Sequence, residues 1–173
     1  MRSISLRMLL LVFLLNPAAA RSAEVVISNG VSVAGIPSTV ANVFIAGERA
    51  ASTLTSSCTG DVVAAQVYWA SQFGGAPDST ELELAFFAAG SFPVPGPVLL
   101  NQGGANAQIS GPVLSEGVMN EFRHLDPPTN LVPMKIPVVA GQSIVLALQF
   151  LNDNNGLLFA PSVVGMGMAA RPA

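Results

Sequence analysis

The sequence contains few charged side chains and almost no histidine, cysteine, tryptophan or tyrosine. Charged residues make up 10% of its 173 residues and the net charge is -3, so nothing in the composition favours nucleic acid as a partner. The single cysteine, Cys58, excludes a disulfide scaffold and any zinc site built from several cysteines. Hydrophobic residues make up 51%, which excludes an intrinsically disordered chain.

The first twenty residues have the composition of a secretory signal peptide. Arg2 and Arg7 supply a positive end, residues 8–15 an apolar stretch, and residues 18–20 a small-residue cleavage site. Eight apolar residues span only about 12 Å as a helix, whereas the hydrocarbon core of a bilayer is about 30 Å thick, which argues against a retained anchor. We therefore expect residues 1–20 to be removed and the mature protein to be secreted, either extracellular or periplasmic, without an integral membrane segment.

Residues 61–87 carry the clearest structural pattern of the mature chain. Apolar side chains alternate with others through residues 61–69 and again through residues 81–87, where Leu82, Leu84 and Phe86 share one face. A Gly/Pro turn at residues 74–77 separates the two runs, so the pattern predicts a β-hairpin. A helix over residues 82–89 is the alternative, but the alternation of Glu and Leu favours a strand.

Further short runs with turn signals between them predict an all-β domain. Residues 143–151 are apolar on both faces and are expected to form the most buried strand, while residues 132–137 contain prolines and suit only an edge strand or an extended segment. Residues 47–52 are expected to form a loop. The sequence therefore predicts a single domain over residues 21–173, an antiparallel β-sandwich or jelly roll. Other strands are expected at residues 24–28, 40–45, 107–110 and 117–125.

Catalytic motifs are weak in this sequence. His124 is followed by Asp126, but no serine lies in a Gly-x-Ser-x-Gly elbow, and a pairing of Cys58 with His124 has no surrounding motif. Glu81 and Glu121 would have to lie about 5 to 9 Å apart to act as a glycosidase pair. We expect no catalytic residues, and His124 is expected to be a histidine at a strand end.

The acidic residues near two turns are candidates for a structural calcium site. Asp78, Glu81 and Glu83 lie beside the Gly-Gly turn, and Asp153 lies among asparagines. Calcium takes six to eight oxygen ligands, which such loops can supply. The spacing around Asp153 does not follow the EF-hand pattern, so solvated turn residues are the competing interpretation. No other cofactor is expected.

Tyr68 and Trp69 are the candidate ligand-binding residues. They are the only tyrosine and the only tryptophan, and an exposed aromatic ring can stack on the flat face of a sugar. Side chains alternate along a strand, so the two rings must point to opposite faces. Trp69 shares the face of Val63, Ala65 and Val67 and is expected to pack in the core.

Several short motifs occur together between residues 58 and 164. They are Cys58-Thr59-Gly60-Asp61-Val62-Val63, Tyr68-Trp69, Gly74-Gly75-Ala76-Pro77, Phe92-Pro93-Val94-Pro95-Gly96-Pro97-Val98-Leu99, Asn120-Glu121-Phe122-Arg123, Val139-Ala140-Gly141-Gln142 and Pro161-Ser162-Val163-Val164. With these motifs the chain resembles a group of uncharacterised secreted bacterial proteins with β-sandwich, jelly-roll-like character. The resemblance implies a fold but no activity. It also implies that such domains continue beyond residue 164 with further strands and another cysteine, so that this domain would be incomplete at its C-terminus and Cys58 without its partner.

Three functions agree with these observations. The first is an exported, non-catalytic binding or accessory module, with an extracellular glycan as a candidate partner. The second is a structural surface protein that self-associates through its sheet edges, which the low charge and the abundance of small residues suggest. The third is a secreted hydrolase. Cys58 is open to an intermolecular disulfide, to a missing partner and to a free thiol.

Overall fold

The computed structural model describes residues 23–29, 46–71, 78–91, 93–151 and 161–173. These residues contain strands and no helix, so the expected all-β class is confirmed and the alternative helix over residues 82–89 is wrong. The predicted signal peptide, the predicted strand at residues 40–45, and the turns at residues 74–77 and around Asp153 lie outside the described residues. The strands are β1 (Val25–Asn29), β2 (Arg49–Thr55), β3 (Gly60–Ser71), β4 (Ser79–Thr80), β5 (Glu83–Ala88), β6 (Gln108–Ser110), β7 (Val113–Leu114), β8 (Val118–Phe122), β9 (Ile136–Val138), β10 (Ser143–Gln149) and β11 (Pro161–Pro172).

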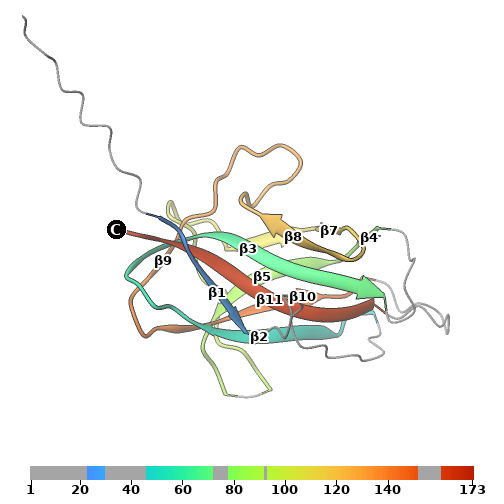
Figure 1. Cartoon of the computed structure of the whole chain (residues 1–173), viewed down its shortest axis with the longest axis horizontal. Helices are drawn as coiled ribbons and strands as arrows, with labels where there is room; N and C mark the ends of the chain where they lie inside the picture. Colours follow the sequence, from blue (N-terminus) through green and yellow to red (C-terminus); the bar gives the residue numbers. More distant parts are fainter. Residues whose placement is uncertain (1–22, 30–45, 72–77, 92, 152–160) are drawn as a thin grey trace, which may run out of the picture.

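The longer strands form two antiparallel sheets (Figure 1). In the five-stranded sheet the order is β1-β11-β3-β8. β9 pairs with the first residues of β3, on the same side of β3 as β8. In the four-stranded sheet the order is β2-β10-β5-β6. β4 and β7 form a short separate pair. Apart from β5 and β6, neighbouring strands in both sheets are not consecutive in the chain, so the fold depends on long-range pairing.

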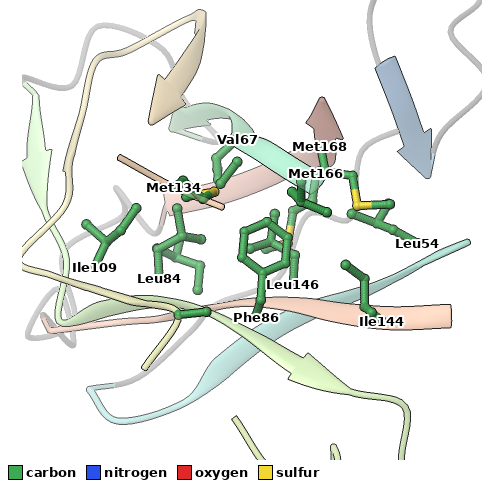
Figure 2. Packing of buried hydrophobic residues seen from close by; sticks show 14 of the residues in the cluster. Leu54, Val67, Leu84, Phe86, Ile109, Met134, Ile144, Leu146, Met166 and Met168 are labelled. Carbon is green, nitrogen blue, oxygen red and sulfur yellow. The ribbon is translucent and has the colours of Figure 1, made fainter. Parts of the chain in front are cut away.

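One hydrophobic core joins the two sheets. Figure 2 shows side chains of both sheets pointing toward one another, with Val67, Met166 and Met168 on one side and Phe86 and Leu146 on the other. All five are at most 4% exposed. This arrangement is consistent with a β-sandwich, in which the inner faces of two sheets interdigitate.

β11 lies in the middle of the five-stranded sheet. It pairs with β1 on one side and with β3 on the other, so the strand closest to the C-terminus is not an edge. β3 and β11 are each twelve residues long and pair from Pro172 with Gly60 to Pro161 with Ser71, with two register shifts. They form the long axis of this sheet.

Two sequence predictions about burial agree with the structure. β10 is flanked by β2 and β5, and its five central residues are all buried, as expected for residues 143–151. β9 pairs only with β3, with Ile136 and Val138 buried and Pro137 exposed between them. Proline cannot donate to a ladder, and its place on an edge strand follows from that.

The predicted hairpin over residues 61–87 is wrong. β3 belongs to the five-stranded sheet and β5 to the four-stranded sheet, so the two strands do not pair with each other. Both strands exist where the alternation predicted them, because a period of two reports extended backbone and not the identity of the partner. The loop predicted at residues 47–52 is also wrong in part, since β2 begins at Arg49 and pairs with β10.

The start of β5 reverses the predicted burial of two neighbouring residues. Glu81 is 1% exposed, whereas Leu82 is 42% exposed. The strand begins only at Glu83, so Leu82 does not share the face of Leu84 and Phe86. Glu81 points inward because its carboxylate accepts hydrogen bonds from the Ser79 hydroxyl at 2.6 Å and from the Leu151 amide at 2.9 Å.

Candidate ligand-binding surface

Tyr68 and Trp69 lie on opposite faces of β3. Trp69 is 2% exposed and belongs to the core between the sheets, as the alternation predicted. Its indole nitrogen is buried and has no hydrogen-bond partner, so packing holds the ring in place. Tyr68 lies between Val67 and Trp69, both in the core, and alternation puts its half-buried ring on the outer face of the five-stranded sheet.

Two cross-strand rows run side by side on this outer face. The first joins Gly165 of β11, Tyr68 of β3 and Met119 of β8. Met119 is 46% exposed and Gly165 has no side chain, so the row is apolar. We call this set of three residues the Tyr68 row.

The neighbouring row is polar. It joins Ser28 of β1, Gly167 of β11, Gln66 of β3 and Glu121 of β8. The Gln66 amide donates to the Glu121 carboxylate at 2.8 Å. A Cβ at Gly167 would lie 3.3 Å from the side-chain oxygen Oε1 of Gln66, so the Gln66 side chain lies close above the glycine. We call these four residues the Gln66 row.

A network of ion pairs crosses the same face beyond the Gln66 row. Arg123 donates two hydrogen bonds to Glu24, at 3.0 and 3.2 Å, and a third to Glu121 at 2.7 Å. Arg171 donates to Glu24 at 2.8 Å. Hydrogen bonds from Arg123 and then Arg171 hold the pKa of Glu24 below its usual value. The network joins the β8 side of the sheet to the β1 side across β3 and β11.

The small residues between these arginines and glutamates are buried on the outer face. Ala64 is 0% exposed, Ala169 is 1% exposed and Val63 is 7% exposed, and the three form a small cluster of their own. Ala64 pairs with Ala169, which pairs with Val26 of β1. The outer face therefore changes along β3 from small and covered, through polar, to apolar at Tyr68.

The predicted calcium ligands have separate partners. Asp78 accepts from the Ser115 hydroxyl at 3.1 Å, and Glu81 is turned into the protein. Glu83 accepts from Gln108 and lies 3.6 Å from Arg49. Among the described residues, no group of three or more histidine, cysteine, aspartate or glutamate side chains is suited to a metal ion. The predicted cluster is not assembled there, and Asp153 lies outside the described residues.

His124 lies at the end of β8 in a bridge with Pro133. It borders a shallow cavity of about 240 Å³ that Glu121, Arg123 and Asn130 also line. The carboxylate of Asp126 accepts from the hydroxyl of Thr129 and from the amides of Val132 and Leu131, and these hydrogen bonds, that of Thr129 first, lower the pKa of Asp126. Asp126 thus caps its own turn.

Cys58 precedes β3 as a half-buried free thiol. The hydroxyl of buried Ser56 donates to the Cys58 carbonyl at 2.6 Å and so fixes the turn before Gly60. The structure gives this cysteine no disulfide partner among the described residues.

The spacing of the glycines in the two rows is a sequence signal for the outer face of β11. In Gly165-Met166-Gly167-Met168 the glycines and methionines alternate. In the structure both methionines enter the core, and the glycines form the opposite face of β11. Alternation of this kind marks a strand with one face left without side chains, but it does not say which strand lies beside it.

Comparison with protein-family models, with curated proteins and with solved structures found no match for this chain. Within the ranges that the structure describes, there is no helix long and apolar enough to cross a membrane.

Proposed function

We propose that this chain is an exported, non-catalytic β-sandwich that binds a ligand at the cell exterior through the outer face of its five-stranded sheet. The observation that carries the proposal is the position of Tyr68. The only tyrosine of the chain faces outward from a central strand, with Gly165 beside it on β11 and exposed Met119 beside it on β8. An outward aromatic ring that faces a glycine on the neighbouring strand is suited to stacking on a ligand.

The proposed export, from a bacterial cell to the periplasm or the medium, is supported by residues 1–20. Their positive end, apolar stretch and small-residue site have the order of a signal peptide. The chain has a single cysteine, so its core forms without an intrachain disulfide, in an oxidising or a reducing compartment.

Strand order supports a jelly-roll assignment. If β1, β2, β3, β5, β6, β8, β10 and β11 are numbered one to eight, one sheet has the order 1-8-3-6 and the other 2-7-4-5. Each sheet thus takes strands alternately from the two ends of the chain, as two Greek keys do when they fold over each other. In this reading the first and last strands pair, as β1 and β11 do.

The carboxylates weighed for a hydrolase have different environments. Glu81 is buried at the start of β5, while Glu121 is exposed on the outer face and engaged by Gln66 and Arg123. Glu81 precedes a strand of the four-stranded sheet, whereas Glu121 lies on a strand of the five-stranded sheet. This arrangement favours binding over glycoside hydrolysis, which needs two carboxyl groups on either side of one bond.

Features of several sheet edges favour binding over self-assembly. β8 carries Glu121 and is followed by Arg123, β9 presents exposed Pro137, and β6 has only three residues. Charges, proline and short length each hinder the addition of a further strand.

The proposal is tested by binding assays on residues 21–173. Purified protein is titrated with soluble polymers of the cell exterior, namely neutral glucans, acidic polysaccharides and peptidoglycan fragments, and affinities are measured by calorimetry. We expect at least one class to bind, Tyr68→Ala to lose that binding, and the matched control Val94→Ala to keep it, because Val94 is 68% exposed and lies outside the five-stranded sheet. Binding that survives in Tyr68→Ala, or none to any polymer, contradicts the proposal.

A further inference from the structure

The Tyr68 row and the Gln66 row together form an amphipathic surface. Tyr68 and Gln66 are two positions apart on β3, which puts the rows about 7 Å from each other. One row offers an aromatic ring and a methionine, and the other offers a hydroxyl, an amide and a carboxylate. A ligand that covers both rows must have an apolar face with hydrogen-bonding groups at its rim.

From this pairing we infer that the ligand is an uncharged pyranose polysaccharide. The inference rests on the proposed binding function and names its ligand class. The C–H face of a sugar ring stacks on Tyr68, and hydroxyls at the rim of that ring or of the next sugar reach Gln66 and Glu121. A pyranose combines a flat apolar face with hydroxyls at its edge, which is the pattern of the two rows.

Charge on this face points to a neutral ligand and not to an acidic one. The two arginines nearest the Gln66 row, Arg123 and Arg171, are engaged by Glu24, and Arg123 also by Glu121. Glu121 itself carries a negative charge next to the place where the sugar hydroxyls lie. A uronic acid carboxylate would meet that charge without an unpaired cation in the row to balance it.

The glycines of β11 make room for the ligand. Gly165 places no side chain across from Tyr68, and Gly167 allows the Gln66 side chain to lie flat on the sheet, with Glu121 holding its amide. The hydrogen bond between Gln66 and Glu121 leaves the side-chain oxygen of Gln66 as an acceptor for a sugar hydroxyl, while the second Glu121 oxygen already accepts from Arg123 at 2.7 Å. Gln66 is in this way a positioned specificity residue before any ligand arrives.

The test compares neutral and acidic polysaccharides on the same protein. Residues 21–173 are assayed with a soluble β-glucan and a galactomannan as neutral probes, and with alginate and polygalacturonate as acidic probes, by affinity electrophoresis and calorimetry. We expect a neutral probe to bind, Tyr68→Phe to stay within about threefold because the ring is kept, and Tyr68→Ala to lose at least about tenfold. Gln66→Ala is expected to lower the affinity for the same probe and to leave the midpoint of the unfolding transition unchanged.

Trp69 follows Tyr68 in the chain and lies in the core. Its fluorescence emission therefore reports whether each variant keeps β3 folded. If Tyr68-dependent binding is found only with acidic polysaccharides or peptidoglycan fragments, the ligand class is wrong and the binding proposal stands. If Tyr68→Ala binds neutral glycans as well as the unmodified protein does, the binding proposal and the neutral ligand class are both wrong. The same holds if the protein binds none of the probes.

Discussion

Glu81 is a carboxylate that the fold removes from water. It is 1% exposed and is held by the Ser79 hydroxyl and the Leu151 amide. Burial raises the pKa of Glu81, and the two hydrogen bonds act in the opposite direction. The carboxylate joins the segment before β5 to the end of β10, which the sequence alternation did not indicate.

Removal of this carboxylate is expected to destabilise the protein. Glu81→Ala removes the acceptor of the partly buried hydrogen bond from the Leu151 amide, which costs about 2 kcal/mol in the free energy of unfolding. Urea unfolding followed by Trp69 fluorescence measures the loss. The control is Asp78→Ala, whose carboxylate is exposed and accepts one 3.1 Å hydrogen bond, and we expect a change within about 0.5 kcal/mol. Equal losses in both variants would refute a special role for Glu81.

The raised pKa of Glu81 predicts the direction of a pH effect. The folded state binds this proton more readily than the unfolded state, whose carboxyl has a pKa near 4.5. Protonation therefore stabilises the fold: the gain is complete below that unfolded value and is lost as pH rises through the folded pKa. We expect the stability of the protein, relative to Glu81→Gln, to increase as the pH is lowered through the raised folded-state pKa toward 4.5. Parallel pH profiles for the two proteins would contradict this assignment.

At the scale of the elements, the pairing of β3 with β11 depends on a close approach at Gly60. A Cβ at this position would lie 2.0 Å from the carbonyl oxygen of Arg171, which is backbone and cannot move aside alone. By contrast, Gly47 precedes β2 in a left-handed conformation, with φ at 87°, and has open space around it. The two glycines are therefore needed for different reasons.

Gly60→Ala is expected to be much more damaging than Gly47→Ala. The first forces β3 and β11 apart and should cost about 3 kcal/mol or more. The second meets only backbone strain and should cost about 1 kcal/mol. Thermal unfolding of both variants, followed by circular dichroism, measures the order. A Gly60→Ala protein as stable as Gly47→Ala would show that the two strands do not approach as described.

The ion-pair network over β3 and β11 is expected to contribute little to stability. The side chains of Arg123 and Glu24 are 43% and 26% exposed, and pairs of this kind are worth roughly 0.2–1 kcal/mol. Arg123→Met should therefore lose less than about 1 kcal/mol at low salt, and the difference should shrink at roughly 1 M salt. Denaturant unfolding at two salt concentrations measures it. A loss that is large and independent of salt would indicate a packing role for the arginine.

Sequence patterns identified many of these elements but not their partners. The alternation in residues 61–69 and the apolar run in residues 143–151 identified β3 and β10 correctly, because burial on one or both faces leaves a pattern in the chain itself. Pairing of β3 with β11 joins residues a hundred positions apart, and no local pattern encodes that choice. For the candidate surface, Tyr68 could be predicted as one of two candidates, whereas Gln66, Gly165 and Gly167 became visible only when the register aligned them.

The molecule as a whole is expected to be a monomer. The charged end of β8, Pro137 on β9 and the short β6 all hinder strand addition between copies. We expect size-exclusion chromatography with light scattering to give one species near the mass of residues 21–173 across a hundredfold range of concentration. Polymers that grow with concentration would favour the structural-protein alternative, and a dimer that reducing agent dissolves would assign Cys58 to an intermolecular disulfide.

The central place of β11 has a consequence for the timing of folding. A chain that emerges from its N-terminus produces β1 and β3 long before the last twelve-residue strand that must be inserted between them. Until that strand arrives, the two early strands have no common neighbour, and the larger sheet cannot close. The five-stranded sheet can therefore become resistant to proteolysis only after β11 has emerged.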